Sequence, residues 1–168
     1  MAHGDPLTNV SQLPGRDPID LLARVIYAEN GASGDEARRA TAWVVKNMVD
    51  CNKNEFKARS TYEKVILNPG SFSCVGNSNF MTPPLTHANW TASLTLATSM
   101  INNPSSVANP ISTSLFFVSS AIFNNANNHK VENGYEYFRF PGSIWLKVTF
   151  KKDFNPTVNA VFFNLEGY

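Results

Sequence analysis

Glu29 ends an amphipathic segment, and its position suits general acid catalysis better than that of any other residue. Asp17-Pro18 predicts a helix start, because an aspartate side chain caps free amides and proline fits the first helical position. The helix should end at Asn30-Gly31. At helical spacing, the face that carries Glu29 also carries Leu22, Val25 and Ile26. Glu29 therefore lies on an apolar stripe that is expected to point into the core.

Two features of this position favour the neutral form of the Glu29 carboxyl group. A charged carboxylate is disfavoured by burial and by the negative end of the helix dipole. A carboxylic acid that stays protonated near neutrality is what general acid catalysis requires. The alternative interpretation is a glutamate rotated towards solvent at a frayed helix end.

Other chemistries find less support in the sequence. His3, His87 and His129 have no companions at metal-ligand spacing, so we expect no metal site and no cofactor. A nucleophilic Cys74 assisted by His87 or His129 is conceivable, although no sequence pattern brings these residues together. Cys51 and Cys74 are compatible with a disulfide, worth ~3 kcal/mol, or with two free thiols.

Composition narrows the class of protein. The chain has 168 residues, 43% of them hydrophobic and 16% charged, which is typical of one globular domain with a weakly charged surface. A formal net charge of +1 without a basic run argues against nucleic acid as a partner. No apolar run is long enough to span a bilayer. The first residues lack the apolar segment of a signal peptide, so we expect either an upstream segment that was removed or another route of export.

Residues 64–131 form a polar stretch without negatively charged side chains. They contain no Asp or Glu but eleven Asn, and they include Trp90. Neutral donors and acceptors together with an aromatic ring suit a polysaccharide ligand. Compositional bias in loops is the alternative explanation.

The pattern of elements predicts helices first and strands later. Residues 1–16 read as an irregular lead-in to one domain over residues 17–168. After the helix that carries Glu29, apparent capping boxes at Ser33/Glu36 and Ser60/Glu63 predict helices to about Val49 and Leu67. A further helix should run from a Thr86 cap to Asn102.

The C-terminal third changes to a strand-like pattern rich in aromatic and β-branched residues. Strands are predicted over residues 114–119, 135–140, 144–150 and 160–165, with Asn133-Gly134 as a tight turn. This order indicates an α+β fold with an antiparallel sheet.

Three segments together resemble the cell wall hydrolase family of spore cortex-lytic enzymes (the SleB/CwlJ type). They are Leu22-Ala23-Arg24-Val25-Ile26-Tyr27-Ala28-Glu29, then Ala40–Val49 with Asn47, then Val65-Ile66 to Pro69-Gly70-Ser71-Phe72-Ser73. The family pattern runs "hA-R-h-h-x-x-E", "h-h-x-N-R" and "h-I-x-x-P-x-x-F-S". The resemblance implies a lysozyme-like helical part packed on the sheet. It also implies cleavage of the peptidoglycan glycan strand between muramoyl and glucosaminyl sugars, with Glu29 as the catalytic residue.

The resemblance also suggests further site residues. Asn47, Phe72, Ser73 and Tyr137 are predicted substrate contacts, with a core position as the alternative for Phe72. Ser33 replaces a second glutamate that many members carry, Met48 replaces an arginine and Arg38 a glutamine. The segment Glu136–Arg139 lacks the histidine of a late "His-x-Phe-Tyr" motif. These differences indicate a divergent branch, of phage or non-spore origin.

The missing second glutamate favours a lytic transglycosylase, which needs one carboxylate, over a hydrolase, which normally uses two. Glu36 and Glu136 stay candidates for a second carboxylate. A catalytically silent glycan-binding module is the first alternative, and an amidase, which usually needs zinc, is the second. The expected partner is the peptidoglycan strand, and the sequence does not identify an accessory protein. The expected place is the cell wall, the spore coat or cortex, or the extracellular space.

Overall fold

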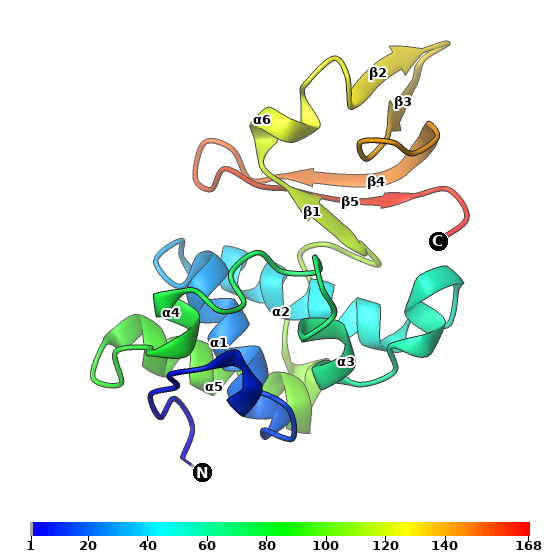
Figure 1. The fold of residues 1–168 in the computed structure, drawn as a ribbon. Coiled ribbons are helices and arrows are strands. Elements are labelled where there is room, and N and C mark those ends of the chain that lie inside the picture. Colours follow the sequence, from blue (N-terminus) through cyan, green and yellow to red (C-terminus); the bar gives the residue numbers. More distant parts are fainter. Residues whose placement is uncertain (1) are drawn as a thin grey trace. The chain divides into compact units, whose positions relative to one another are not determined.

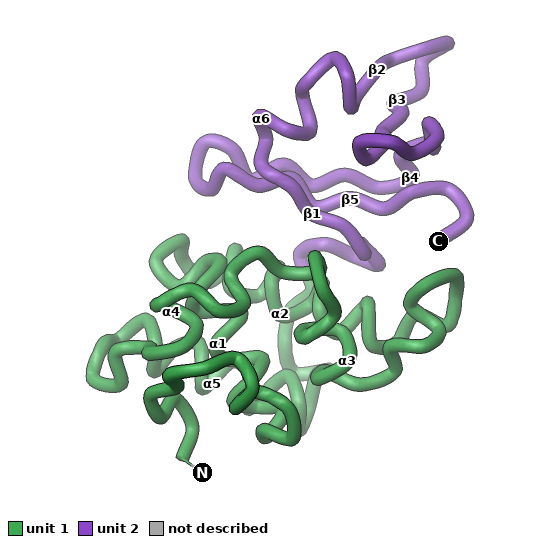
Figure 2. The backbone as a smooth tube through the Cα atoms, in the orientation of Figure 1, with its two compact units in different colours: residues 1–109 green, residues 110–168 purple. Residues whose placement is uncertain are grey.

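The computed structural model describes residues 2–168 and has an α+β fold. Its described part contains six α-helices and a five-stranded antiparallel sheet, with helices N-terminal and strands C-terminal (Figure 1). This arrangement confirms the predicted fold class. The chain divides into two compact units, residues 1–109 and residues 110–168 (Figure 2). The domain predicted over residues 17–168 covers parts of both units and stays a prediction.

Unit 1 is helical. Its α-helices are α1 (Pro18–Asn30), α2 (Asp35–Asp50), α3 (Tyr62–Ile66), α4 (Ser78–Met81) and α5 (Ala88–Asn102). Short 3-10 helices cover Val10–Gln12, Asn54–Ala58 and Pro104–Ser106, the first of them inside the predicted irregular lead-in. The central element is α1, because it packs against each of the other four α-helices of this unit.

The helix α1 forms where the sequence predicts it. The Asp17 side chain accepts a hydrogen bond from the Ile19 amide at 2.8 Å, and Pro18 occupies the first helical position. Leu22, Val25 and Ile26 are completely buried, as the stripe predicts.

The predicted capping residues of α2, α3 and α5 were wrong by one position. Gly34 precedes α2 without a side-chain cap, at a φ of 87° that favours glycine, so Ser33 and Glu36 form no capping box. Thr61 rather than Ser60 caps α3, through a hydrogen bond from the Lys64 amide. His87 rather than Thr86 caps α5. The helices themselves are confirmed, because the apolar stripes outweigh the identity of a single cap.

A buried network of ion pairs connects the lead-in to α1. Arg24 is completely buried, and its Nε donates to Asp20 at 2.8 Å. Its other guanidinium nitrogens donate to the carbonyls of Asp5, Phe80 and Met81 at 2.7 to 3.0 Å. Arg16 pairs with both Asp20 and Asp5. Arg24, which belongs to the motif "hA-R", is therefore held by structural contacts to the lead-in and α4.

Unit 2 contains the sheet. Its strands are β1 (Phe116–Val118), β2 (His129–Glu132), β3 (Tyr135–Phe138), β4 (Leu146–Asp153) and β5 (Val161–Leu165), in the order β1-β5-β4-β3-β2, with the short helix α6 (Ser120–Phe123) between β1 and β2. The strand β2 was not predicted. Asn133 and Gly134 link it to β3 with φ angles of 52° and 79°, which confirms the predicted tight turn.

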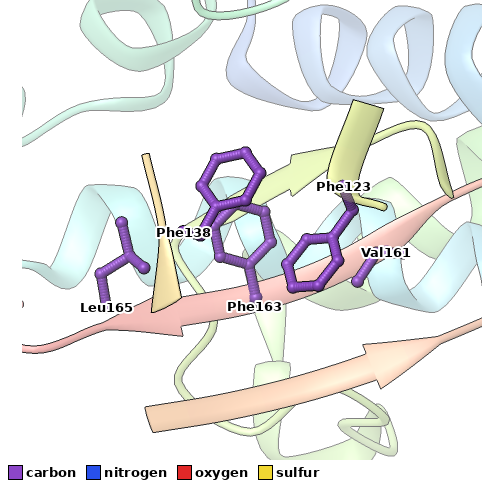
Figure 3. Packing of buried hydrophobic residues seen from close by; sticks show 5 residues of the cluster. All are labelled: Phe123, Phe138, Val161, Phe163 and Leu165. Carbon is purple, nitrogen blue, oxygen red and sulfur yellow. The ribbon is translucent and has the colours of Figure 1, made fainter. Parts of the chain in front are cut away.

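Aromatic rings form the core of unit 2 on one face of this sheet. Phe123, Phe138 and Phe163 are buried, and their ring centres lie 4.7 to 5.2 Å apart pairwise. Val161 and Leu165 complete the buried cluster along β5 (Figure 3). The Phe123 ring of α6 packs on the face of the sheet that carries Phe138 and Phe163, so this is the buried face.

Candidate functional site

Glu29 lies in the last turn of α1 and is half-buried. One of its carboxyl oxygens, Oε1, is buried and has no hydrogen-bond partner among residues 2–168. A buried oxygen without a partner is costly and therefore uncommon in a folded protein. The residue as a whole is half-buried, so part of Glu29 stays open to solvent although Oε1 itself is enclosed.

The side chain beside Glu29 is Cys74, which the sequence did not place there. Cys74 lies in the loop after α3, is buried, and its thiol is close enough to hydrogen-bond to the Glu29 carboxyl group. Burial, followed by the negative charge of Glu29 and that hydrogen bond, raises the pKa of the Cys74 thiol far above its usual range. The thiol therefore stays protonated and acts as a donor, so the thiolate nucleophile considered from the sequence is not favoured here.

The histidines considered as its partners have other roles. Nδ1 of His87 accepts a hydrogen bond from the Asn89 amide at 3.1 Å and caps α5. His129 belongs to unit 2, where Nε2 lies 3.7 Å from Glu136. Cys51 and Cys74 are both free thiols. Within the described residues no cluster of three metal-ligating side chains occurs.

Contacts between α1 and α2 fix the backbone next to Glu29. Nδ2 of Asn30 donates to the Thr41 hydroxyl at 2.8 Å, and this hydroxyl donates to the Ala37 carbonyl at 3.1 Å, all within buried surroundings. Arg38 donates to the Gly31 carbonyl and pairs with Asp35, which lowers the pKa of the Asp35 carboxyl group. The sequence indicated Asn30 only as part of a helix stop, and no pattern identified Thr41.

The predicted substrate contacts have different surroundings. Asn47 is half-buried near the end of α2, and Ser73 is exposed immediately before Cys74. Phe72 is 5% exposed, which agrees with the core position that the sequence left open. Trp90, considered as a ring for stacking on sugars, is instead buried in unit 1, where it contacts Tyr27 edge to face at 6.0 Å.

The two candidate second carboxylates lie in different units. Glu36 is exposed in the first turn of α2. Glu136 on β3 pairs with Lys151 in unit 2. Because neighbouring side chains alternate across a strand, Glu136 and Tyr137 point to opposite faces of the sheet. These two residues therefore do not line one face together.

A separate cleft of about 830 Å³ lies on unit 1, and Glu29 is not among its lining residues. Asp35 and Arg39 of α2 line it together with the outer side of α5 and residues 106–108. Nε of Arg39 is buried without a hydrogen-bond partner within residues 2–168. This cleft and the Glu29–Cys74 pair are distinct features of the helical unit.

Comparison with protein-family models, with curated protein sequences and with solved structures found no match. No helix within residues 2–168 combines the length and apolar character needed to cross a membrane.

Proposed function

We propose that this chain cleaves the glycan strand of peptidoglycan at the cell wall, as a lytic transglycosylase with Glu29 as its acid and base. The observation that carries the proposal is the Glu29 carboxyl group at the end of α1, half-buried and with one buried oxygen that lacks a partner. A carboxyl group in such surroundings can exchange a proton with a bound ligand. The resemblance of the segment around Glu29 to cell wall hydrolases supplies the substrate class.

In the proposed reaction one carboxyl group serves twice. Glu29 donates its proton to the oxygen that bridges the muramoyl and glucosaminyl sugars, and the bond from that oxygen to the muramoyl C1 breaks. The Glu29 carboxylate then takes the proton of the muramoyl 6-hydroxyl, whose oxygen bonds to C1 and closes a 1,6-anhydro ring. Glu29 ends the cycle protonated, and no water is consumed.

Hydrolysis would need a second carboxylate at about 5–9.5 Å from the first. Glu36 is exposed, and Glu136 is engaged by Lys151. Ser33, where many members of the cell wall hydrolase family carry a glutamate, offers only a hydroxyl. The single-carboxylate reaction is therefore the simpler proposal. Asn47 and Ser73 of unit 1 are the proposed substrate contacts, and Tyr137 of unit 2 stays a prediction from the resemblance.

Mass spectrometry of the fragments released from purified peptidoglycan tests this function. We expect muropeptides that end in 1,6-anhydro-muramic acid. Fragments with reducing muramic acid ends would instead identify a hydrolase, and free stem peptides would identify an amidase. Intact strands after prolonged incubation with folded protein would overturn the proposal.

A further inference from the structure

A row of three side chains crosses β2, β3 and β4 on one face of the sheet in unit 2. Lys130 is paired in register with Tyr137, and Tyr137 with Lys147. Side chains that are paired in register point to the same face. Phe138 and Leu146, the neighbouring pair, point to the opposite face and contribute to the aromatic core. The row therefore lies on the face of these strands away from that core.

Three further side chains extend the row, each two positions along the chain from one of its members. We call the six residues together the basic aromatic face: Lys130, Tyr135, Tyr137, Arg139, Trp145 and Lys147. Tyr135 is 50% exposed, and the other five are half-buried.

Each cation of the basic aromatic face lies close to at least one of its rings. Nζ of Lys147 lies 3.3 Å from the ring centre of Tyr135. Nζ of Lys130 lies 5.4 Å from the ring of Tyr137 and 5.2 Å from that of Trp145. The Arg139 guanidinium lies 4.5 Å from the Trp145 ring. These contacts order the rings and the charges in one surface.

The charge on this surface is positive. It has three cations, and one carboxylate, that of the exposed Glu132, pairs with Lys130 at 2.6 Å. Three positive charges and one negative charge give this surface a net charge of +2. Because the aromatic core lies on the other face, burial in that core does not account for three rings here. Tyrosine and tryptophan side chains that are partly exposed to solvent are typical of binding surfaces.

We propose that the basic aromatic face binds the peptidoglycan strand, with its rings against the sugars and its cations against the carboxylates of the stem peptides. This inference rests on the proposed function, because that function supplies the polymer. Nucleic acid fits less well: unit 2 has five Lys and Arg against four Asp and Glu, a net +1, whereas strand-binding grooves are strongly basic. The surface also contains Tyr137, a substrate contact expected from the resemblance.

Binding can be measured apart from cleavage with the full chain carrying Glu29→Gln. The probe is purified peptidoglycan free of other wall polymers, used intact and after amidation of its carboxyl groups, and bound protein is measured by sedimentation. In this background we expect Trp145→Ala and Lys130→Ala each to weaken binding at least about fivefold, as the loss of a cation–ring or stacking contact does. Amidation should weaken binding similarly, and Trp145→Tyr should retain most of it.

Two matched variants serve as controls. Val131→Ala alters the residue next to Lys130, 65% exposed and on the opposite face. Lys57→Ala removes one exposed positive charge from unit 1. Both should bind as the parent does, and circular dichroism should confirm that all variants are folded.

The outcomes separate this inference from the proposed function. Binding that Trp145→Ala and Lys130→Ala leave unchanged would overturn the inference alone, as would cleavage by the wild type without measurable binding by the Glu29→Gln chain. Tighter binding of a single-stranded oligonucleotide than of peptidoglycan would also overturn it. Binding that depends on the basic aromatic face, without any product from the wild type, would overturn only the proposed reaction. If the protein shows no binding and no cleavage, both the inference and the proposed function are overturned.

Discussion

The buried thiol of Cys74 lies near enough to the Glu29 carboxyl group for that group to raise its pKa, so the loop after α3 approaches the end of α1. The thiol is buried, so it approaches the carboxyl group as a neutral donor. A donor at this place can orient the carboxyl group without neutralising it. Asn30, held by Thr41, restrains the backbone next to Glu29.

The first prediction concerns the reactivity of Cys74. Because burial and then Glu29 raise its pKa, alkylation of Cys74 in the folded protein should begin well above the ~8.5 of an unperturbed cysteine. Glu29→Gln should move the onset to lower pH, although burial will still keep it elevated. The measurement is the alkylation rate against pH, with peptide mapping to separate Cys74 from Cys51. An onset that Glu29→Gln leaves unchanged would contradict the contact.

The raised pKa of Cys74 also predicts a loss of stability at alkaline pH. Above ~8.5 the unfolded chain loses the thiol proton while the folded protein keeps it, so unfolding is favoured as pH rises. The free energy of unfolding should therefore fall by up to ~1.4 kcal/mol per pH unit from this group. Urea denaturation at several pH values checks the slope, and Cys74→Ala should reduce it. Equal slopes for both proteins would contradict this prediction.

The next prediction concerns the buried hydrogen bond from Asn30 to Thr41. Thr41→Val keeps the shape of the side chain but leaves the Asn30 amide without its acceptor. The loss should be ~1–3 kcal/mol in the free energy of unfolding, the cost of an unsatisfied buried donor. If this bond also positions Glu29, cleavage should slow by more than the unfolded fraction explains. Thr82→Val, at an exposed bond from its hydroxyl to the Ser78 carbonyl, is the matched control and should cost less than ~1 kcal/mol.

How far the sequence predicts this structure depends on the range of the interactions. The helix α1 is predicted almost to the residue, because its cap, its proline and its apolar stripe all act within a few positions. The strand β2 was missed because four residues after an Asn-rich loop carry little pattern. It forms through its pairing with β3 across the Asn133-Gly134 turn.

The candidate site was predictable in one part only. Glu29 is identifiable from its own helix, but Cys74 comes to it through the packing of the loop after α3, which has no periodic signal. For Trp90 the residue type was misleading. A tryptophan can stack on sugars, but this one is buried in the core of the helical unit. Residue type predicts the possible chemistry, whereas burial decides between chemistry and core.

Arg24 gives a prediction about the role of the "hA-R" motif. It is completely buried, with a carboxylate and three carbonyls as partners, so Arg24→Leu leaves Asp20 and these carbonyls poorly satisfied. The free energy of unfolding should fall by ~3–5 kcal/mol, as when one partner of a buried ion pair is removed. Denaturation in urea is the measurement. Lys46→Leu, which removes a partly exposed partner of Asp50, should cost no more than ~1 kcal/mol. A similar loss of free energy of unfolding in both variants would show that the buried contacts of Arg24 stabilise the fold no more than an exposed ion pair does.

The last prediction concerns Glu29 itself. Glu29→Gln keeps the size of the side chain, removes the proton that it can donate, and leaves the buried stripe on α1 unchanged. If one carboxyl group serves as acid and then as base, both halves of the reaction fail together. We expect the release of anhydro-muropeptides to fall at least ~100-fold, the typical contribution of positioned proton transfer. Stability should stay equal or rise slightly, because a neutral amide replaces an acid at the negative end of a helix dipole.

Glu36, which is exposed in the first turn of α2, provides the control for Glu29→Gln. Glu36→Gln changes the same functional group by the same chemistry, and it should keep activity within about threefold if Glu36 is no second carboxylate, since an exposed charge contributes little. A Glu29→Gln protein that releases product at nearly the wild-type rate would place the chemistry elsewhere. Glu136, which pairs with Lys151 on β3, would then be the next carboxylate to replace.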